Sequence, residues 1–173
     1  MLKALLHLVP PPDCPVNTGS VAEWHSITAD LAQELPQELF LLNSAYGSGH
    51  FVQEEFSIEI HSVFRPAFTL MVDFNRRVFA QEAIRHPNPY SNMFELGAYA
   101  WGDDQGSMGR LFWDTSGTMD DWMIGLSRPL QRYSTSLLEF LVKCFSNEMH
   151  PTGFPEKFTS VRFVPWERPS LID

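Results

Sequence analysis

Apolar residues recur at helical spacing between residues 20 and 46. Ser20 and Glu23 have the spacing of a capping box, in which each side chain satisfies the free backbone N–H of the other residue. Pro36 separates two apolar stripes, because it can end one helix and begin the next where its missing N–H costs nothing. The stripes, which predict two helices, are Val21, Trp24, Thr28, Leu31 and Leu35, followed by Leu39, Leu42 and Tyr46.

The period of the pattern changes to two from residue 55. Apolar and polar side chains alternate there, as they do in a strand with one buried face. The alternating residues are Phe56, Ile58 and Ile60 on the apolar side and Ser57, Glu59 and His61 on the polar side.

Helical spacing returns after residue 66. Leu70, Phe74 and Val78 follow one another at intervals of four, so we expect a helix with these residues on its buried side. Arg76 and Arg77 then fall on the side that faces water.

The stretch from residue 93 to 128 predicts three short strands joined by Gly- and Asp-rich turns. Aromatic and apolar segments between such turns are typical of an antiparallel meander. The three segments are Met93–Trp101, Met108–Asp114 and Asp121–Leu126. A last helix is expected from residue 137 behind a serine or threonine cap, and residues 158–164 are expected to add an edge strand, since Pro165 cannot donate to a ladder.

The order of these elements indicates the fold class. Helices come first, strands form a block, and a helix follows, which favours an α+β domain with helices against one mainly antiparallel sheet. We expect five or six strands flanked by three or four helices in a single domain, residues 1–173.

Composition narrows the class of protein. Hydrophobic residues make up 44% of the 173 residues and charged residues 19%, which excludes a disordered chain. Residues 1–9 are too short an apolar run for a secretory signal, so we expect a loose or capped N-terminal strand. No stretch has the 18 or more apolar residues that span a bilayer, and two cysteines fit a reducing compartment. A cytoplasmic protein is expected.

The net charge of −9 is unevenly distributed. Residues 1–64 carry eight acids and one base, and residues 93–125 carry six acids and one base. The basic cluster is small, which argues against direct nucleic-acid binding; it consists of Arg65, Arg76, Arg77 and Arg85. An acidic surface favours and steers basic partners, although the same charge also keeps a hydrophobic domain soluble.

Motifs of catalysis are missing from the sequence, which has no phosphate-binding glycine loop, zinc-binding helix or nucleophile elbow. Ser48 and His50 lie close in sequence, but the glycines around Ser48 are better explained as a helix exit. An aspartate cluster allows three interpretations: solvated turns, a partner-facing surface, or a metal-binding or catalytic site. Its members are Asp103, Asp104, Asp114, Asp120 and Asp121. The tryptophans Trp101, Trp113 and Trp122 suit either core packing or an exposed binding patch.

Several segments together resemble the SUKH superfamily, which contains fungal cell-wall assembly regulators and many bacterial immunity proteins. The segments that carry the resemblance are Leu35–Leu39, Tyr46–Gly49, Trp101–Asp104, Leu111–Asp114, Trp122 and the helix with Leu137 to Leu141. They cover about residues 20–150, and residues 1–18 and 151–173 lie outside as peripheral extensions. The resemblance implies an α+β fold, no enzyme activity, no catalytic residues and no cofactor.

Charge and resemblance together lead to one hypothesis. The protein is expected to be a non-enzymatic immunity protein that neutralises a toxin, such as a basic nuclease, through an acidic face. The residues expected in this face are Asp103, Asp104, Asp120 and Asp121, with Glu54, Glu55 and Glu59. Two alternatives remain: a regulatory adaptor of the cell-wall regulator type, and a metal-dependent hydrolase that uses Asp103, Asp104, Asp114 and Asp121.

Overall fold

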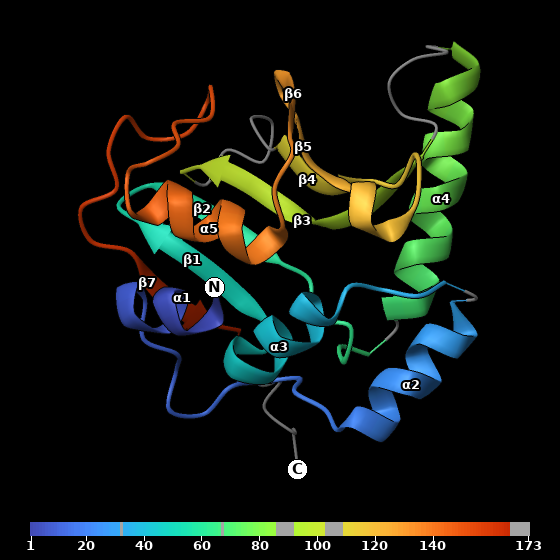
Figure 1. Ribbon diagram of the computed structural model, residues 1–173, viewed down its shortest axis with the longest axis horizontal. Coiled ribbons are helices and arrows are strands. Elements are labelled where there is room, and N and C mark those ends of the chain that lie inside the picture. Colours follow the sequence, from blue (N-terminus) through green and yellow to red (C-terminus); the bar gives the residue numbers. More distant parts are fainter. Residues whose placement is uncertain (32, 67, 86–91, 103–108, 167–173) are drawn as a thin grey trace.

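The computed structural model describes residues 1–31, 33–66, 68–85, 92–102 and 109–166. Seven strands form one antiparallel sheet in the order β6-β5-β4-β3-β2-β1-β7 (Figure 1). Their bounds are β1 Gly49–Gln53, β2 Phe56–Ile60, β3 Met93–Trp101, β4 Gly109–Asp114, β5 Met123–Ser127, β6 Leu130–Tyr133 and β7 Arg162–Pro165. The described residues also form five α-helices: α1 Leu2–Leu8, α2 Val21–Asp30, α3 Gln37–Tyr46, α4 Phe68–Arg85 and α5 Leu137–Phe145.

This architecture confirms the α+β class. The described residues form one or two strands more than the five or six expected, and one or two α-helices more than the three or four expected. The three strands of the predicted meander are present as β3, β4 and β5. Two strands had no signal in the sequence: β1, which pairs with β2, and β6, which pairs with β5. Burial alternates along both strands, but four or five residues are too few for this alternation to be recognised in the sequence.

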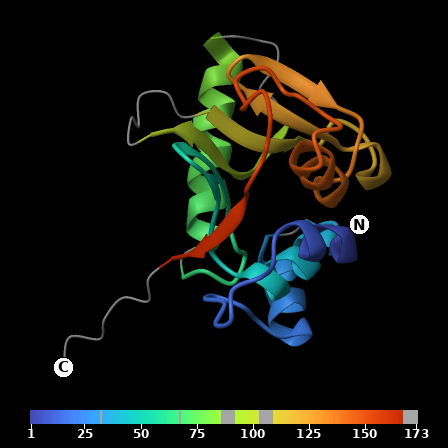
Figure 2. The ribbon, with the colours of Figure 1, turned by 90° about the vertical axis from the view of Figure 1, so that its left-hand side faces the viewer.

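Helices α1, α3 and α5 cover one face of the sheet, as the side view in Figure 2 shows. The core lies between these layers. Phe51 of β1 packs on Phe145 of α5 and on Tyr46 of α3, with ring centroids 5.3 and 5.1 Å apart. His50, the neighbour of Phe51, must point to the opposite face, because side chains alternate along a strand. We call the surface of β1 and β2 that carries His50 the His50 face; Glu59 lies on it as well, because it pairs with His50 across the two strands.

Side-chain caps fix the helix starts as the sequence predicts. The capping box of α2 is complete: Ser20 accepts from the backbone N–H of Glu23, and the Glu23 carboxylate accepts from that of Ser20. Ser136 caps α5 through the backbone N–H of Glu139. The start of α5 is also capped by Glu38 of α3, whose carboxylate accepts from the backbone N–H groups of Leu137 and Leu138.

The N-terminal segment is a helix, so the expected strand is wrong. Leu2, Leu5, Leu6 and Val9 have helical spacing, and Leu5 and Val9 are fully buried. Residues 2–8 pack against α5, and the Tyr46 hydroxyl donates to the Val9 carbonyl over 2.5 Å. This packing decides the conformation of a run too short for periodicity to show.

Both ends of the chain contribute to the core. Besides α1, the C-terminal part supplies the buried Phe154 and Phe158 and the strand β7, which pairs with β1. Strand β7 is an edge strand of the sheet, as Pro165 predicts. No helix within the described ranges is long and apolar enough to cross a membrane.

Helix α4 is present where helical spacing predicts it, but its buried side is a different one. Phe68, Val72 and Asn75 are buried, and α4 packs along β3. Leu70 and Phe74, expected in the core, are exposed. Spacing alone is ambiguous here, because residues 68, 72 and 75 recur at helical intervals as well as residues 70, 74 and 78.

Candidate protein-binding site

The β1–β2 hairpin presents two of the predicted acidic residues at its tip. Gln53 pairs with Phe56, so Glu54 and Glu55 form a two-residue turn, and both are exposed. Gln53 itself is buried: its amide donates to the Lys157 carbonyl and accepts from the backbone N–H of Thr159. These hydrogen bonds fix the residue from which the turn begins. We call Glu54 and Glu55 the acidic tip.

Glu54 has a backbone conformation that its residue type rarely adopts. Its φ is +51°, in the left-handed region, where Gly and Asn are favoured. The other non-glycine residues with positive φ in the described part of the chain are Asn17 and Asn147. A glutamate in this region raises the free energy of the fold by about 1 kcal/mol. The hairpin thus keeps a carboxylate at its tip although glycine or asparagine would fit the backbone better.

A shallow hollow lies beside the acidic tip and is lined by Val52, Glu54, Glu55, Phe56, Ser57 and Gly102. The backbone N–H of Gly102 donates to the Glu55 carbonyl over 2.5 Å, which fixes the end of β3 against the tip. Asp103 and Asp104 follow Gly102 directly in the chain but lie outside the described residues. The point where the chain enters these two aspartates is therefore adjacent to Glu55.

Asp120 and Asp121 lie at the other end of the sheet. They belong to a 3₁₀ turn, Met119–Asp121, between β4 and β5. Asp114 ends β4 on that side, whereas Gly109, at the opposite end of β4, pairs with Tyr99 near the acidic tip. A strand of six residues is about 20 Å long, so the structure separates this pair of aspartates from Glu54 and Glu55. The hydroxyl of Thr118 donates to the Asp121 carboxylate.

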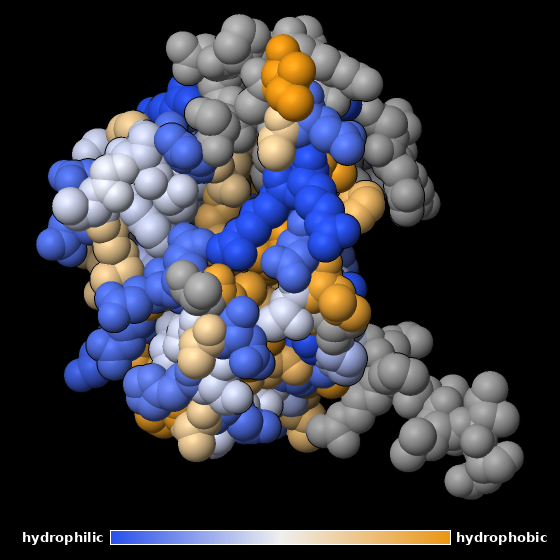
Figure 3. All heavy atoms as spheres, turned by 90° about the vertical axis from the view of Figure 1, so that its right-hand side faces the viewer, coloured by the Kyte–Doolittle hydropathy of each residue, from blue (hydrophilic) through white to orange (hydrophobic). Residues whose placement is uncertain are grey.

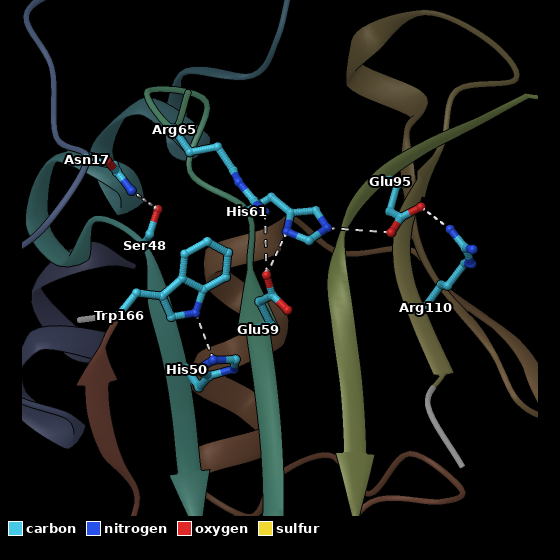
Figure 4. Close-up of polar contacts among 9 residues, drawn as sticks. All are labelled: Asn17, Ser48, His50, Glu59, His61, Arg65, Glu95, Arg110 and Trp166. Atoms are coloured by element: carbon cyan, nitrogen blue, oxygen red, sulfur yellow. Dashed lines mark hydrogen bonds and ion pairs between the residues drawn. The ribbon is translucent and has the colours of Figure 1, made fainter. Parts of the chain in front are cut away.

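Glu59 belongs to a polar cluster that starts on the His50 face and extends to β3 (Figure 4). Its Oε1 lies 3.0 Å from Nδ1 of His61 and 3.8 Å from Nη1 of Arg65. On its other side, His61 Nε2 lies 3.5 Å from Oε1 of Glu95, whose second oxygen accepts from Arg110. Glu59 is half-buried and already paired with internal cations. The charge of Glu59 therefore has partners within the fold, and its expected role in an acidic face stays a prediction.

The pKa values of this cluster show how tightly its charges are coupled. Burial alone would lower the pKa of His61, but hydrogen bonds with Glu59 and Glu95 and the charges of both raise it above its ordinary value. Burial alone would raise the pKa of Glu59, but the hydrogen bond and charge of His61, with the charges of His50 and Arg65, lower it. The arrangement favours an imidazolium between two carboxylates.

Ser48 and His50 have separate partners. Ser48 is buried and accepts a hydrogen bond from the Asn17 amide over 2.9 Å. His50 Nε2 accepts from the indole N–H of Trp166 over 2.7 Å, and Arg65 stacks over the Trp166 ring at 4.4 Å (Figure 4). Helix α3 ends at Tyr46, and Gly47 follows it with a φ of +69°. These contacts support the interpretation of this segment as a helix exit.

The three tryptophans divide between the core and the surface. Trp113 is buried and packs on Phe94 and on Trp122, which is partly buried. Trp101 is 42% exposed, and its indole N–H donates to the Gly153 carbonyl. They do not form a common exposed patch.

The aspartate cluster is divided as well. Asp114 is buried, receives a hydrogen bond from Arg132 over 2.5 Å and accepts from the hydroxyl of Ser116. Burial alone would raise its pKa, but these hydrogen bonds and the charge of Arg132 lower it. In the ranges that the structure describes, no group of three or more His, Cys, Asp or Glu side chains could hold a metal ion.

Comparison with known proteins gives no match, either to a protein-family model, to a curated protein or to a solved structure. The SUKH resemblance therefore stays an interpretation of the sequence.

Proposed function

We propose that this protein is a non-enzymatic binding domain that holds a basic protein partner at the acidic tip. The observation that supports this most is the left-handed backbone of Glu54, which retains a carboxylate at a position that favours glycine. Strained residues that persist on a surface are candidates for function. In line with the SUKH resemblance, we propose that the partner is a toxin and that binding neutralises it.

The acidic tip has no structural task within the described residues, whereas several other acids have one. The carboxylates that cap a helix or pair with a cation of the same chain include those of Glu23, Glu38, Glu59, Glu95, Asp114 and Glu139. Glu54 and Glu55 make no ion pair or side-chain hydrogen bond with another described residue, and both are exposed. Their charges are thus available to a partner.

A basic partner fits both this local charge and the net charge of −9. Charge complementarity of this kind accelerates association by about tenfold to a thousandfold at low salt. A nuclease is a natural example, because it must present cationic groups to phosphates. A protein that covers those groups with carboxylates would block the nucleic acid from binding.

The first experiment is affinity capture from native cells with three immobilised proteins. The wild type is compared with Glu54→Gln/Glu55→Gln and with Asp13→Asn/Glu34→Gln, which removes the same charge from exposed acids elsewhere. We expect one basic protein that the wild type and the control retain at low salt, that high salt releases, and that the tip variant retains poorly. Equal retention by all three proteins would contradict the proposed site.

The second experiment tests neutralisation with the captured protein. Its association rate with the tip variant is expected to fall about tenfold, with a smaller dependence on salt. If the partner is a toxin, co-expression of the wild type should restore the growth that the partner arrests, and the tip variant should restore less. Several weakly held partners without toxicity would instead support the regulatory adaptor.

A further inference from the structure

Helix α4 exposes three large apolar side chains. Leu70, Phe74 and Ile84 are 69%, 65% and 83% exposed, whereas Phe68 and Val72 anchor the helix to the protein. Figure 3 shows the side of the molecule where α4 lies, with hydrophobic residues on either side of a strongly hydrophilic band. Isolated exposed apolar residues are common, but several on one helix indicate a contact surface.

The exposed residues of α4 have the spacing of a coiled-coil seam. They follow one another at intervals of four, three, four and three residues, which places them on one face of the helix. All five are exposed: Leu70, Phe74, Arg77, Gln81 and Ile84. We call this row the α4 seam; its two ends are apolar and its centre is polar.

We propose that the α4 seam pairs with the seam of a second copy of this chain in antiparallel orientation. In a parallel pair each residue would face its own copy, which would place the two Arg77 side chains together. Antiparallel pairing with a and d positions matched sets Phe74 against Ile84 of the second copy and Arg77 against Gln81 of the second copy. The contact between Phe74 and Ile84 then forms twice by symmetry, and Arg77 and Gln81 in the polar centre can form hydrogen bonds.

Charge favours a second copy over the basic partner proposed for the acidic tip. A basic protein would bring a like charge to Arg77 in the centre of the seam. A second copy instead brings the amide of Gln81 opposite Arg77, and the amide oxygen can accept from the guanidinium. Asp73 stays paired with Arg76 of its own helix, at 3.9 Å. The seam and the acidic tip therefore suit different occupants.

The size of the seam sets the strength of the pair. A helix of 18 residues is about 27 Å long, and two such helices bury less than the roughly 800 Å² per partner of a stable interface. We therefore expect a dissociation constant between about 10 µM and 1 mM. Because each copy carries a net charge of −9, salt should screen the repulsion between copies and strengthen the pair.

Sedimentation of the full chain over that concentration range tests the pairing. The wild type is expected to form dimers more strongly at high than at low salt, the opposite of binding to a basic partner. Phe74→Ser/Ile84→Ser should raise the dissociation constant at least about tenfold. Leu130→Ser, which changes a partly exposed leucine of β6, should leave it unchanged. A wild type that stays monomeric at 1 mM in both salts, or a seam variant that dimerises equally well, would overturn the proposal.

Cysteine cross-linking tests the orientation. In chains that also carry Cys14→Ser, which removes the exposed native thiol, Arg77→Cys and Gln81→Cys are oxidised separately and as a mixture. Antiparallel pairing places residue 77 of one copy opposite residue 81 of the other. Disulfide-linked dimers should therefore form faster in the mixture than in either variant alone. Faster cross-linking of Arg77→Cys with itself would overturn the antiparallel arrangement. Neither result depends on the acidic tip.

Discussion

At the scale of single residues, the acidic side chains of the described chain fall into two groups. Glu59, Glu95 and Asp114 are paired with cations inside the fold, whereas Glu54 and Glu55 face solvent. The sequence shows all of these residues as acids near strands or turns, and its alternation correctly places Glu59 on the polar face of β2. The sequence could not reveal that His61, which follows β2, would pair with both Glu59 and Glu95 of β3.

Replacement of Glu54 by glycine should separate stability from binding. Glu54→Gly relieves the left-handed backbone, and we expect the fold to gain about 0.5–1 kcal/mol, or about 2 °C in melting temperature. Partner binding should weaken at the same time. Thermal unfolding and partner association measure the two effects.

Glu55→Gly is the matched control for this change. Glu55 has no positive φ, so glycine there only increases the entropy of the unfolded chain and should lower stability by up to about 1 kcal/mol. If both glycine variants change stability in the same direction, the strain assigned to Glu54 is absent.

The polar cluster predicts a specific dependence of stability on pH. The pKa of His61 is raised from 6.5, so its protonated form stabilises the fold fully below pH 6.5, and this contribution is lost as pH rises through the folded value. The pKa of Glu59 is lowered from 4.5, so its contribution is present above pH 4.5 and is lost on acidification. The cluster is therefore most stabilising between about pH 4.5 and 6.5.

His61→Gln should accordingly lower the melting temperature more at pH 6 than at pH 8.5. The difference between variant and wild type is the quantity to measure, because His50, whose pKa burial lowers, titrates with the opposite sign. His150→Gln, at an exposed histidine, serves as the control for the loss of an imidazole elsewhere in the chain. A loss for His61→Gln that is equal at both pH values would mean that His61 is neutral in the fold.

At the scale of elements, α5 depends on a side chain from another helix. The Glu38 carboxylate of α3 accepts from the backbone N–H groups of Leu137 and Leu138, at 2.7 and 3.1 Å. These N–H groups have no partner within their own helix, and an anion at a helix N-terminus also meets the favourable end of the helix dipole. One residue thus links the packing of α3 to the start of α5.

Glu38→Ala should therefore destabilise the protein by about 1–2 kcal/mol. Urea unfolding measures the change, and the midpoint should fall without a change in the slope of the transition. Glu34→Ala, which removes an exposed acid just before α3, is expected to have an effect within about 0.5 kcal/mol. Similar losses for both variants would show that Glu38 acts through net charge rather than as a cap.

The elements that the sequence predicts best are those with local signals. Ser20 with Glu23, and Ser136 before α5, mark helix starts through contacts within three residues. The predicted buried side of α4 is wrong, because only the packing of Phe68 and Val72 near β3 distinguishes the two apolar stripes of this helix. Similarly, Glu54 is recognisable as a turn residue only once Gln53 and Phe56 are known to pair.

At the scale of the whole molecule, antiparallel order decides which acids can act together. The tip of β1–β2 and the end of β3 meet because β2 and β3 are neighbours, whereas the turn between β4 and β5 lies at the other end of the sheet. Sequence distance gives the opposite impression, since Asp120 is closer in the chain to Asp103 than Glu55 is. Of the described residues expected in the acidic face, Glu54 and Glu55 therefore lie together, whereas Asp120 and Asp121 lie at the other end of the sheet.

The contact between α1 and α5 has a consequence for how the chain folds. Helix α1 buries Leu5 and Val9 against a helix that follows only at residues 137–145, and β7 joins β1 later still. Contacts between such distant parts of a chain slow folding, because a long loop must close before they form. During synthesis, α3 is available to α1 early, but the side of α1 that contacts α5 stays uncovered until nearly all of the sheet has been made. Folding of this protein should be late and cooperative rather than progressive from the N-terminus.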